Sequence, residues 1–422
     1  MSAFSKIDMG EVTRLTQAGK LAEAMALLQG QTASRAARDN PGQDVAGSSA
    51  KVRGWSPSAP TIDMVAPSGL NGAWTGPPQS NQRTDGGLVR PVKAAATPDL
   101  AQTMLALRDR FPKLRSVSGI AGGRGIARQT PVVVPGGARF EERTFSNAAG
   151  SRTYKVYVPS GYIGQSLPVV IMLHGCTQNP DDFAVGTRMN DVAEEQTFLV
   201  AYPRQSQSAN MQKCWNWFNA ADQQRGGGEP SLIAGIALQV VAEFSADPTR
   251  VYVAGLSAGG AAAAIMAATY PDIFAAVGVH SGLACGAARD MPSAFAAMGG
   301  SGAMRPRGEG RMVPTIVFHG DADRTVNPVN SDQVIAQAGQ EATLTKMVTH
   351  GETPGGMTYT RTVQLDAGGG EVLEQWVLHG AGHAWSGGSI SGSYTDARGP
   401  DASREMARFF LAHARANAMS SH

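Results

Sequence analysis

Short apolar runs alternate with helical patterns along the chain from about residue 140. Four of these runs are rich in β-branched or aromatic residues and end in a polar or glycine-containing turn; they span 167–175, 197–205, 250–257 and 274–282. The helical patterns that separate them span 189–196, 231–248 and 258–271. Because strands joined through helices run parallel in one sheet, the alternation predicts a mainly parallel sheet with helices on both faces.

Further runs extend this pattern at both ends. Residues 143–146 and 152–159 predict a leading antiparallel hairpin around the turn NAAGS. The later runs 313–320 and 372–380 add two strands, and 401–416 has the apolar spacing of a closing amphipathic helix. We therefore predict an α/β domain over residues 136–418.

The N-terminal third has a different composition. Residues 1–30 place apolar side chains at helical spacing, which predicts an amphipathic helix suited to docking or self-association. Residues 31–135 are rich in Gly, Pro and Ser, which predicts a largely disordered linker. Residues 1–130 hold 16 Lys and Arg against 9 Asp and Glu. Such a basic tail can bind an anionic surface, and a solvated linker is the alternative.

Composition narrows the classes of function. The formal net charge of the 422 residues is +2, so the whole chain has no strong electrostatic preference for nucleic acid or anionic membrane. No apolar run is long enough to predict a transmembrane helix. The first 30 residues lack the apolar core and cleavage site of a secretory signal, which favours a cytoplasmic location. Three cysteines are too few for a zinc ribbon or a small disulfide scaffold.

One serine lies between a strand pattern and an alanine-rich helix pattern. The sequence from Gly255 to Gly259 is G-x-S-x-G, with Ser257 at its centre. In this strand, turn and helix context the motif is typical of a nucleophile elbow, and a helix N-cap is the purely structural alternative. The helix N-terminus supplies positive potential, and the backbone N–H of Ala258 would face a developing oxyanion.

A serine nucleophile needs a histidine base and a carboxylate that orients it, in the chain order Ser, Asp or Glu, His. Two aspartates follow the strand pattern 313–320, and we favour Asp323 over Asp321 because it lies further into the loop. His379 ends the next strand pattern, whereas His383 lies beyond a flexible glycine arm. We therefore favour His383 as the base. Three other histidines end apolar runs and are expected to hold strand-end loops; they are His174, His280 and His319.

The loop after the first parallel strand is the expected source of a second oxyanion donor, and the backbone N–H of Cys176 is our candidate. The Cys176 side chain could pair with Cys214 in a disulfide, and a pair of thiols is the alternative. Three tryptophans near these motifs are candidates for substrate binding, with core packing as the alternative. They are Trp215, Trp217 and Trp385.

The motifs LHGCTQ, CWNWF, GLSAGG, HGDAD and GAGHAWSGG together resemble the polyhydroxybutyrate depolymerase family of serine esterases, which is similar to feruloyl and acetylxylan esterases. The resemblance spans about residues 140–415. It implies an α/β-hydrolase fold without metal or organic cofactor. It also implies Ser257 as nucleophile, His383 as base, Asp323 as its orienting acid, and the amides of Cys176 and Ala258 as oxyanion donors. A Cys176–Cys214 disulfide is among its implications.

The resemblance implies hydrolysis of polyhydroxybutyrate or related hydroxyalkanoate esters through an acyl-enzyme. The alternatives are a feruloyl or acetylxylan-type esterase and, from another class, a non-catalytic protein that binds polymer granules through its N-terminal part. Extracellular depolymerases of this kind are usually exported, so the resemblance allows an extracellular location as well. The expected partners are an ester substrate, polymeric or not, and for the N-terminal helix a second copy or a granule surface.

Overall fold

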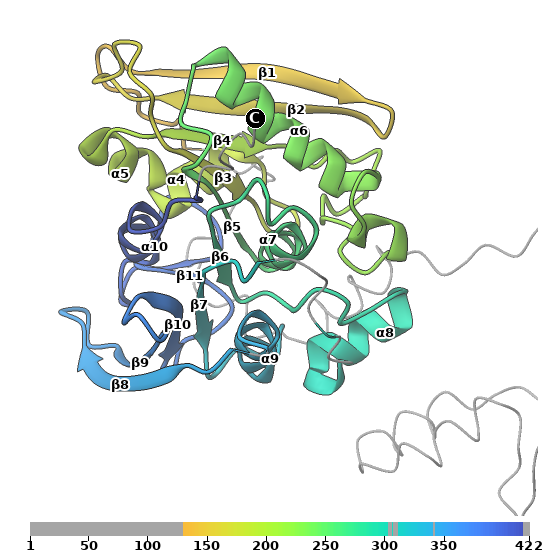
Figure 1. The fold of residues 1–422 in the computed structure, drawn as a ribbon, viewed down its shortest axis with the longest axis vertical. Coiled ribbons are helices and arrows are strands. Elements are labelled where there is room, and N and C mark those ends of the chain that lie inside the picture. The colour runs from red at the N-terminus through yellow and green to blue at the C-terminus, as the bar shows by residue number, and fades with distance from the viewer. Residues whose placement is uncertain (1–129, 303–305, 307–310, 341, 417–422) are drawn as a thin grey trace, which may run out of the picture. The chain divides into compact units, whose positions relative to one another are not determined.

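The computed structural model describes residues 130–302, 306, 311–340 and 342–416. The predicted helix of residues 1–30 and the predicted linker up to residue 129 lie outside this part. The described residues are built around one ten-stranded sheet with the strand order β1-β2-β4-β3-β5-β6-β7-β10-β9-β8 (Figure 1). The six strands from β4 to β10 in this order pair in parallel, and antiparallel strands flank them on both sides.

The sheet is formed by the following strands: β1 Arg139–Asn147, β2 Gly150–Val158, β3 Val169–Leu173, β4 Leu199–Pro203, β5 Val251–Leu256, β6 Ala276–His280, β7 Thr315–Gly320, β8 Thr345–Glu352, β9 Thr358–Leu365 and β10 Glu371–Leu378. A separate pair consists of β11 Trp385–Ser386 and β12 Thr395–Asp396. Every residue of the central strands β3, β5, β6 and β7 is buried. This explains their continuous apolar sequences, because a parallel strand covered on both faces does not alternate with polar residues.

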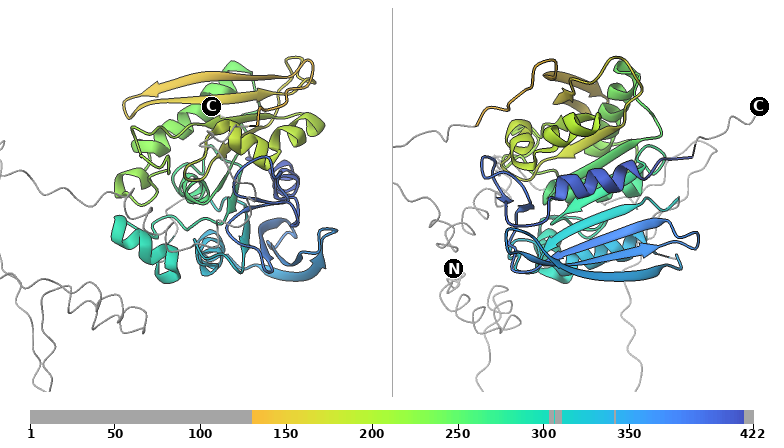
Figure 2. Two further views of the ribbon diagram at one scale, coloured as in Figure 1. Left: turned by 180° about the vertical axis from the view of Figure 1, so that it is seen from behind. Right: turned by 90° about the vertical axis from the view of Figure 1, so that its left-hand side faces the viewer.

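Helices cover both faces of the sheet. The α-helices are α4 Pro180–Thr187, α5 Met189–Gln196, α6 Gly228–Glu243, α7 Ala258–Thr269, α8 Met291–Ala296, α9 Val329–Ala338 and α10 Ala402–Leu411. Helices α4, α5 and α10 pack on one face, and α6, α7 and α9 pack on the other (Figures 1 and 2). Each face has its own hydrophobic core, because neighbouring residues of a strand point to opposite sides.

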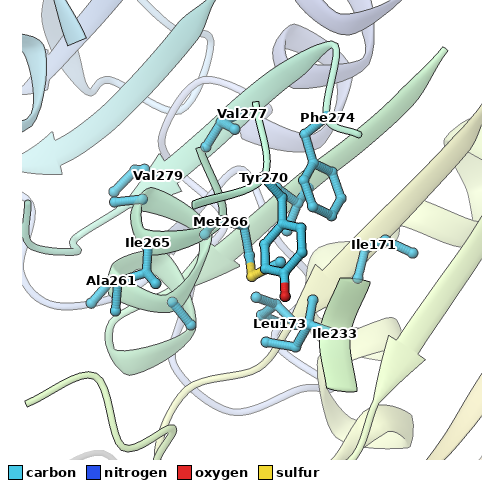
Figure 3. Close-up of a cluster of buried hydrophobic side chains, with 14 of the residues drawn as sticks. Ile171, Leu173, Ile233, Ala261, Ile265, Met266, Tyr270, Phe274, Val277 and Val279 are labelled. Carbon is cyan, nitrogen blue, oxygen red and sulfur yellow. The ribbon is translucent and has the colours of Figure 1, made fainter. Parts of the chain in front are cut away.

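The alanine-rich helix α7 packs closely on the centre of the sheet. Ile265 and Met266 of this helix lie in the same apolar cluster as Leu173 of β3 and Val279 of β6, and Ile233 reaches it from α6 (Figure 3). Small side chains along α7 allow this close packing. The helix therefore holds its N-terminus, where Ser257 lies, firmly against the carboxyl ends of the strands.

The predicted α/β-hydrolase architecture is confirmed, including the leading hairpin, the four central strands and the closing helix. The hairpin β1–β2 turns between Asn147 and Gly150, within the predicted NAAGS segment. The sequence did not reveal β8 and β9, since β8 is exposed along nearly its whole length and has no apolar face. It also did not reveal α4, α8 and α9. Within the described residues, no helix is long and apolar enough to cross a membrane.

Helix α6 offers a direct test of which side faces the sheet. Ile236 is fully buried, whereas Leu238, two residues further on, is 52% exposed. We expect Ile236→Ala to lower the free energy of unfolding by about 2–5 kcal/mol, because it leaves a cavity in the core. Leu238→Ala is the matched control and should change it by less than about 0.5 kcal/mol. Denaturant unfolding measures both, and equal effects of the two substitutions would contradict the packing described.

Candidate active site

Ser257 occupies a strained turn between β5 and α7. Its backbone angles are φ 58° and ψ −119°, a combination that residues other than glycine rarely adopt. Its N–H donates to the carbonyl of His280 at 2.9 Å, which ties the turn to the end of the neighbouring strand β6. Such a conformation costs on the order of 1–3 kcal/mol and persists only where the surrounding structure imposes it.

Two glycines of the motif allow this turn through close backbone contacts. A Cβ atom on Gly259 would lie 2.0 Å from the carbonyl oxygen of Leu173, at the end of β3. A Cβ atom on Gly255 would lie 2.4 Å from the backbone of Gly259 itself. The start of α7 can therefore approach the sheet only because both positions lack a side chain.

Asp323 and His383 form a buried pair beyond the ends of β7 and β10. His383 Nδ1 lies 2.7 Å from Asp323 Oδ2, and the side chains are 12% and 0% exposed. The other carboxylate oxygen of Asp323 accepts the amides of Thr325 and Val326 at 2.8 and 3.0 Å. The aspartate is therefore held in one orientation, with one oxygen directed at the histidine.

The surroundings of Asp323 keep it ionised. Burial by itself would raise the pKa of its carboxyl, but hydrogen bonds from His319 and His383 outweigh this effect and hold the pKa well below its usual range. His319 contributes from β7, with Nε2 at 3.4 Å from Asp323 Oδ2 and 2.9 Å from the carbonyl of Val326. The carboxylate thus stays negative beside His383.

His280 connects the serine turn to the histidine loop. Its carbonyl accepts the Ser257 amide, and its ring Nε2 accepts the amide of Ser386, three residues after His383, at 3.0 Å. The ring stacks between Phe318 and Trp385. Burial, with contributions from His319 and His383, holds the pKa of His280 well below its usual value. His280 therefore stays neutral and can accept the Ser386 amide that fixes the loop.

The second aspartate and the second histidine form a separate pair. His379 Nδ1 lies 2.9 Å from Asp321 Oδ2, and the other Asp321 oxygen accepts the amide of Gly380 at 2.7 Å. These side chains are 39% and 42% exposed, and His379 Nε2 is engaged by Thr360 of β9 at 2.9 Å. This pair faces solvent and holds the backbone at Gly380. The buried pair Asp323–His383 is the one that His280 links to the serine turn.

The loop that follows β3 lies beside the serine. A Cβ atom built on Gly175 would come within 3.7 Å of Ser257 Cβ. The side chain of Gln178 anchors this loop: its Oε1 accepts the Gly175 amide at 2.9 Å, and its Nε2 donates to Asp182 at 3.0 Å. Among the hydrogen bonds of the described residues, none uses the backbone N–H of Cys176 or Ala258 as donor. Cys176 is half-buried and Ala258 is buried, and the two remain the candidate oxyanion donors.

On its other side the loop is held by His174 and a disulfide. Cys176 and Cys214 are joined by a disulfide bond, which decides between the two states that the sequence left open. His174 Nδ1 lies 2.8 Å from the carbonyl of Gly175, and its Nε2 accepts the amide of Gln205 at 3.1 Å. Burial lowers the pKa of His174 to about 4, so the ring is neutral near neutral pH. As expected from their positions, His174, His280 and His319 each bind a strand-end loop.

The three candidate tryptophans are largely inside the core. Trp215 is fully buried and donates to the carbonyl of His174 at 3.1 Å. Trp385 is 1% exposed and donates to Ser403 at 3.1 Å. The ring faces of these two are covered by protein, which corrects the expectation that they bind substrate. Trp217 keeps the largest exposed fraction of the three, 7%.

Three buried polar side chains lie near the site although the sequence did not indicate them. Gln178, Gln205 and Glu229 all make buried side-chain hydrogen bonds near the loop after β3. A glutamine at the end of LHGCTQ and a glutamate two residues before the predicted helix 231–248 give no pattern that distinguishes them from surface residues. Within the part of the chain that the structure describes, no group of three or more His, Cys, Asp or Glu side chains is arranged to hold a metal ion.

The close contact at Gly259 predicts the effect of adding one methyl group. Gly259→Ala should lower the free energy of unfolding by at least about 1–3 kcal/mol, because the new Cβ must displace the end of β3. Gly299→Ala is the control, since nothing lies within 4 Å of its Cβ position. Thermal unfolding compares the two variants with the parent chain. A Gly259→Ala chain as stable as the control would show that the approach of α7 to the sheet is not as close as described.

The chain is similar to several known esterases. Residues 152–348 match the family model described as Esterase PHB depolymerase. Poly(3-hydroxyalkanoate) depolymerase C of Paucimonas lemoignei is 33% identical over 251 residues, which are 57% of this chain and 60% of that protein. Feruloyl esterase B of Neurospora crassa is 36% identical over 140 residues, which are 33% of this chain and 46% of that protein. The chain thus spans less than two thirds of the length of either relative.

A solved structure supports the fold independently. The acetyl xylan esterase from Aspergillus awamori superimposes with a TM-score of 0.51 at 20% sequence identity, covering 65% of this chain and 99% of that one. At this identity the likeness bears on the fold alone. Together with the family match and the depolymerase relative, it leads to one assignment: the described domain has the α/β-hydrolase fold, and residues 152–348 within it are similar to the Esterase PHB depolymerase family.

Proposed function

We propose that the chain is a serine hydrolase of carboxylic esters, with Ser257 as nucleophile, His383 as base and Asp323 as the acid that orients the base. The observation that carries this proposal is the combination of the strained Ser257 turn with the buried Asp323–His383 pair, which the backbone and ring of His280 tie together. A serine held at positive φ above a helix N-terminus has little structural advantage by itself.

The proposed reaction has two acyl-transfer steps. Because Nδ1 of His383 is bound to Asp323, Nε2 is the nitrogen left to take the Ser257 proton as Oγ attacks the ester carbonyl. The imidazolium then protonates the leaving alcohol as its bond to the carbonyl carbon breaks, which leaves an acyl-serine. Water attacks the acyl-serine with His383 again as base, and the proton returns to Ser257 as the acid is released.

Two features of the site favour the charged transition state. The amides of Cys176 and Ala258 are the proposed donors to the oxyanion, and the N-terminus of α7 adds positive potential. The ionised Asp323 stabilises the imidazolium that forms on His383. Both are arranged before substrate binds, because the loop after β3 and the loop after β7 are held by hydrogen bonds within the protein.

For the substrate we propose esters of hydroxyalkanoates, as oligomers or polymer. The family match and the depolymerase relative support this choice. Exposed apolar and aromatic groups near the loop after β3 also suit an aliphatic chain: Met211 is 63% exposed next to Gln212, whose carbonyl accepts the Thr177 amide, and Tyr394 is 45% exposed with its hydroxyl 3.3 Å from Thr177 Oγ1. The feruloyl esterase relative supports the alternative, an esterase of acetylated or feruloylated polysaccharide.

The division of the chain is also part of the proposal. We assign the esterase to residues 136–418, and we assign self-association or docking on a polymer granule to the predicted helix of residues 1–30. Residues 31–135 would then act as a linker between the two. This assignment rests on composition and helical spacing, since residues 1–129 lie outside the described part.

Substitution of the triad tests the mechanism. Ser257→Ala should abolish labelling by a fluorophosphonate and lower the turnover of a small ester by about 10⁴-fold or more, and His383→Ala should lower it comparably. His379→Ala is the matched control, because His379 belongs to the exposed pair, and it should retain most of the turnover. Labelling at another serine, or a larger loss in the His379 variant than in the His383 variant, would refute the proposed roles.

A panel of esters tests the substrate. We expect the purified chain to have its highest kcat/KM on short hydroxybutyrate oligomers, compared with methyl ferulate and acetylated xylan, because apolar groups border the site. The 422-residue chain and a variant without residues 1–130 should have equal kcat/KM on soluble oligomers. Their rates of hydrolysis should differ on polymer granules. A preference for the ferulate or the xylan would favour the alternative. Binding of granules without hydrolysis of any ester would favour a non-catalytic role.

A further inference from the structure

A buried carboxylate lies behind the disulfide loop, away from the proposed triad. Glu229 is the second residue of α6 and is only 6% exposed. Its Oε2 accepts the backbone amide of Asn216 at 2.7 Å, and its Oε1 accepts the Asn216 side chain at 2.8 Å and the side-chain amide of Gln205. The guanidinium of Arg152 lies 3.7 Å away on β2. Every one of these partners is a donor, so the network requires Glu229 as an acceptor on both oxygens.

Ionisation of Glu229 is unfavourable in this environment. Burial, reinforced by the negative charge of Asp222, raises the pKa of the Glu229 carboxyl to about 7, although the hydrogen bonds from Asn216 and Gln205 favour the ionised form. A buried charge kept next to a candidate active site is more often functional than one placed elsewhere. The contacts of its partners indicate what the function would be.

Gln205 connects Glu229 to the loop after β3 through hydrogen bonds. Its side-chain Nε2 binds both Glu229 and the carbonyl of Cys214 at 2.9 Å, while its backbone N–H donates to His174 Nε2. Cys214 is bonded to Cys176 through the disulfide. Glu229 is therefore connected to the Cys176 segment by two routes, one through the disulfide and one through His174.

The route through His174 acts on a particular peptide group. With Nε2 accepting from Gln205, Nδ1 carries the proton and donates to the carbonyl of Gly175. That carbonyl and the N–H of Cys176 belong to one planar trans peptide, so they point in opposite directions. Fixing the Gly175 oxygen on His174 therefore aims the Cys176 N–H away from His174.

We propose that Glu229 is a positioning residue of the esterase, which holds the Gly175–Cys176 peptide group so that the Cys176 N–H faces the oxyanion. This inference rests on the proposed function. It adds to that function a residue that touches neither substrate nor triad and acts through Gln205, His174 and the disulfide. Its effect should appear in the chemical step and in the binding of tetrahedral analogues more than in the binding of substrate.

Glu229→Gln is the direct test, because it keeps the size of the side chain but puts an NH2 group among donors. In the full chain we expect kcat on a 4-nitrophenyl ester to fall by about 10- to 100-fold, below the 10²- to 10³-fold typical of removing an oxyanion donor outright. KM should change by less than about twofold. The inhibition constant of a trifluoromethyl ketone with the same acyl group should rise by the factor by which kcat/KM falls.

Glu374→Gln is the matched control for a general loss of stability. Glu374 is a fully buried glutamate in the middle of β10, bound to Arg361, Arg408 and Trp376 at 2.6–2.8 Å. Its replacement should lower the unfolding temperature but leave the kcat of folded enzyme within about twofold of the parent. Gln205→Met removes the side-chain amide that binds both Glu229 and the carbonyl of Cys214. Like Glu229→Gln, it should lower kcat.

The outcomes separate this inference from the proposed function. If the parent chain hydrolyses no ester, or if Ser257→Ala keeps its activity, the proposed function fails. If the parent is an esterase but folded Glu229→Gln keeps its kcat, or loses no more than Glu374→Gln, the positioning role is overturned. If neither Glu229→Gln nor Gln205→Met folds, Glu229 determines the fold instead, and the positioning role is likewise overturned.

Discussion

The left-handed backbone at Ser257 is the constraint on which the rest of the site depends. A residue other than glycine adopts φ 58° together with ψ −119° only if its neighbours prevent relaxation, and here β3, β6 and α7 do so together. The Ser257 amide is bound to His280, and the first turn of α7 rests against the carbonyl of Leu173 through Gly259. A central sheet with fully buried strands is rigid enough to hold that strain.

Buried polar side chains hold the loops of the site in fixed orientations on this rigid sheet. The interior of the fold holds His174, His280, Asp323 and Glu229, and each makes hydrogen bonds to the backbone of a loop at the carboxyl edge of the sheet or to its anchors. A neutral buried histidine has one donor and one acceptor nitrogen, so it can fix two segments at once. The site therefore depends on a framework of buried side chains as much as on the residues proposed to react.

The two aspartate and histidine pairs illustrate how far sequence reasoning could reach. HGDAD and GAGH lie at strand ends, because a strand pattern followed by polar residues and glycine marks a loop at the sheet edge. The choice between Asp321 and Asp323 depended only on loop position. In the structure the difference is burial: the pair Asp323–His383 is enclosed, whereas Asp321–His379 faces solvent and braces Gly380. Periodicity carries no information on that difference.

By itself, the sequence determined the succession of the leading hairpin, the central strands and the closing helix along the chain, the parallel centre of the sheet and the position of the G-x-S-x-G turn. These follow from local apolar patterns and from glycines that the turn requires. Only the tertiary structure decided the state of Cys176 and Cys214, the burial of Trp215 and Trp385, and the hydrogen bond between Gln205 and Glu229. Each of these depends on contacts between segments far apart in the chain, and local pattern does not specify which buried donors and acceptors will meet.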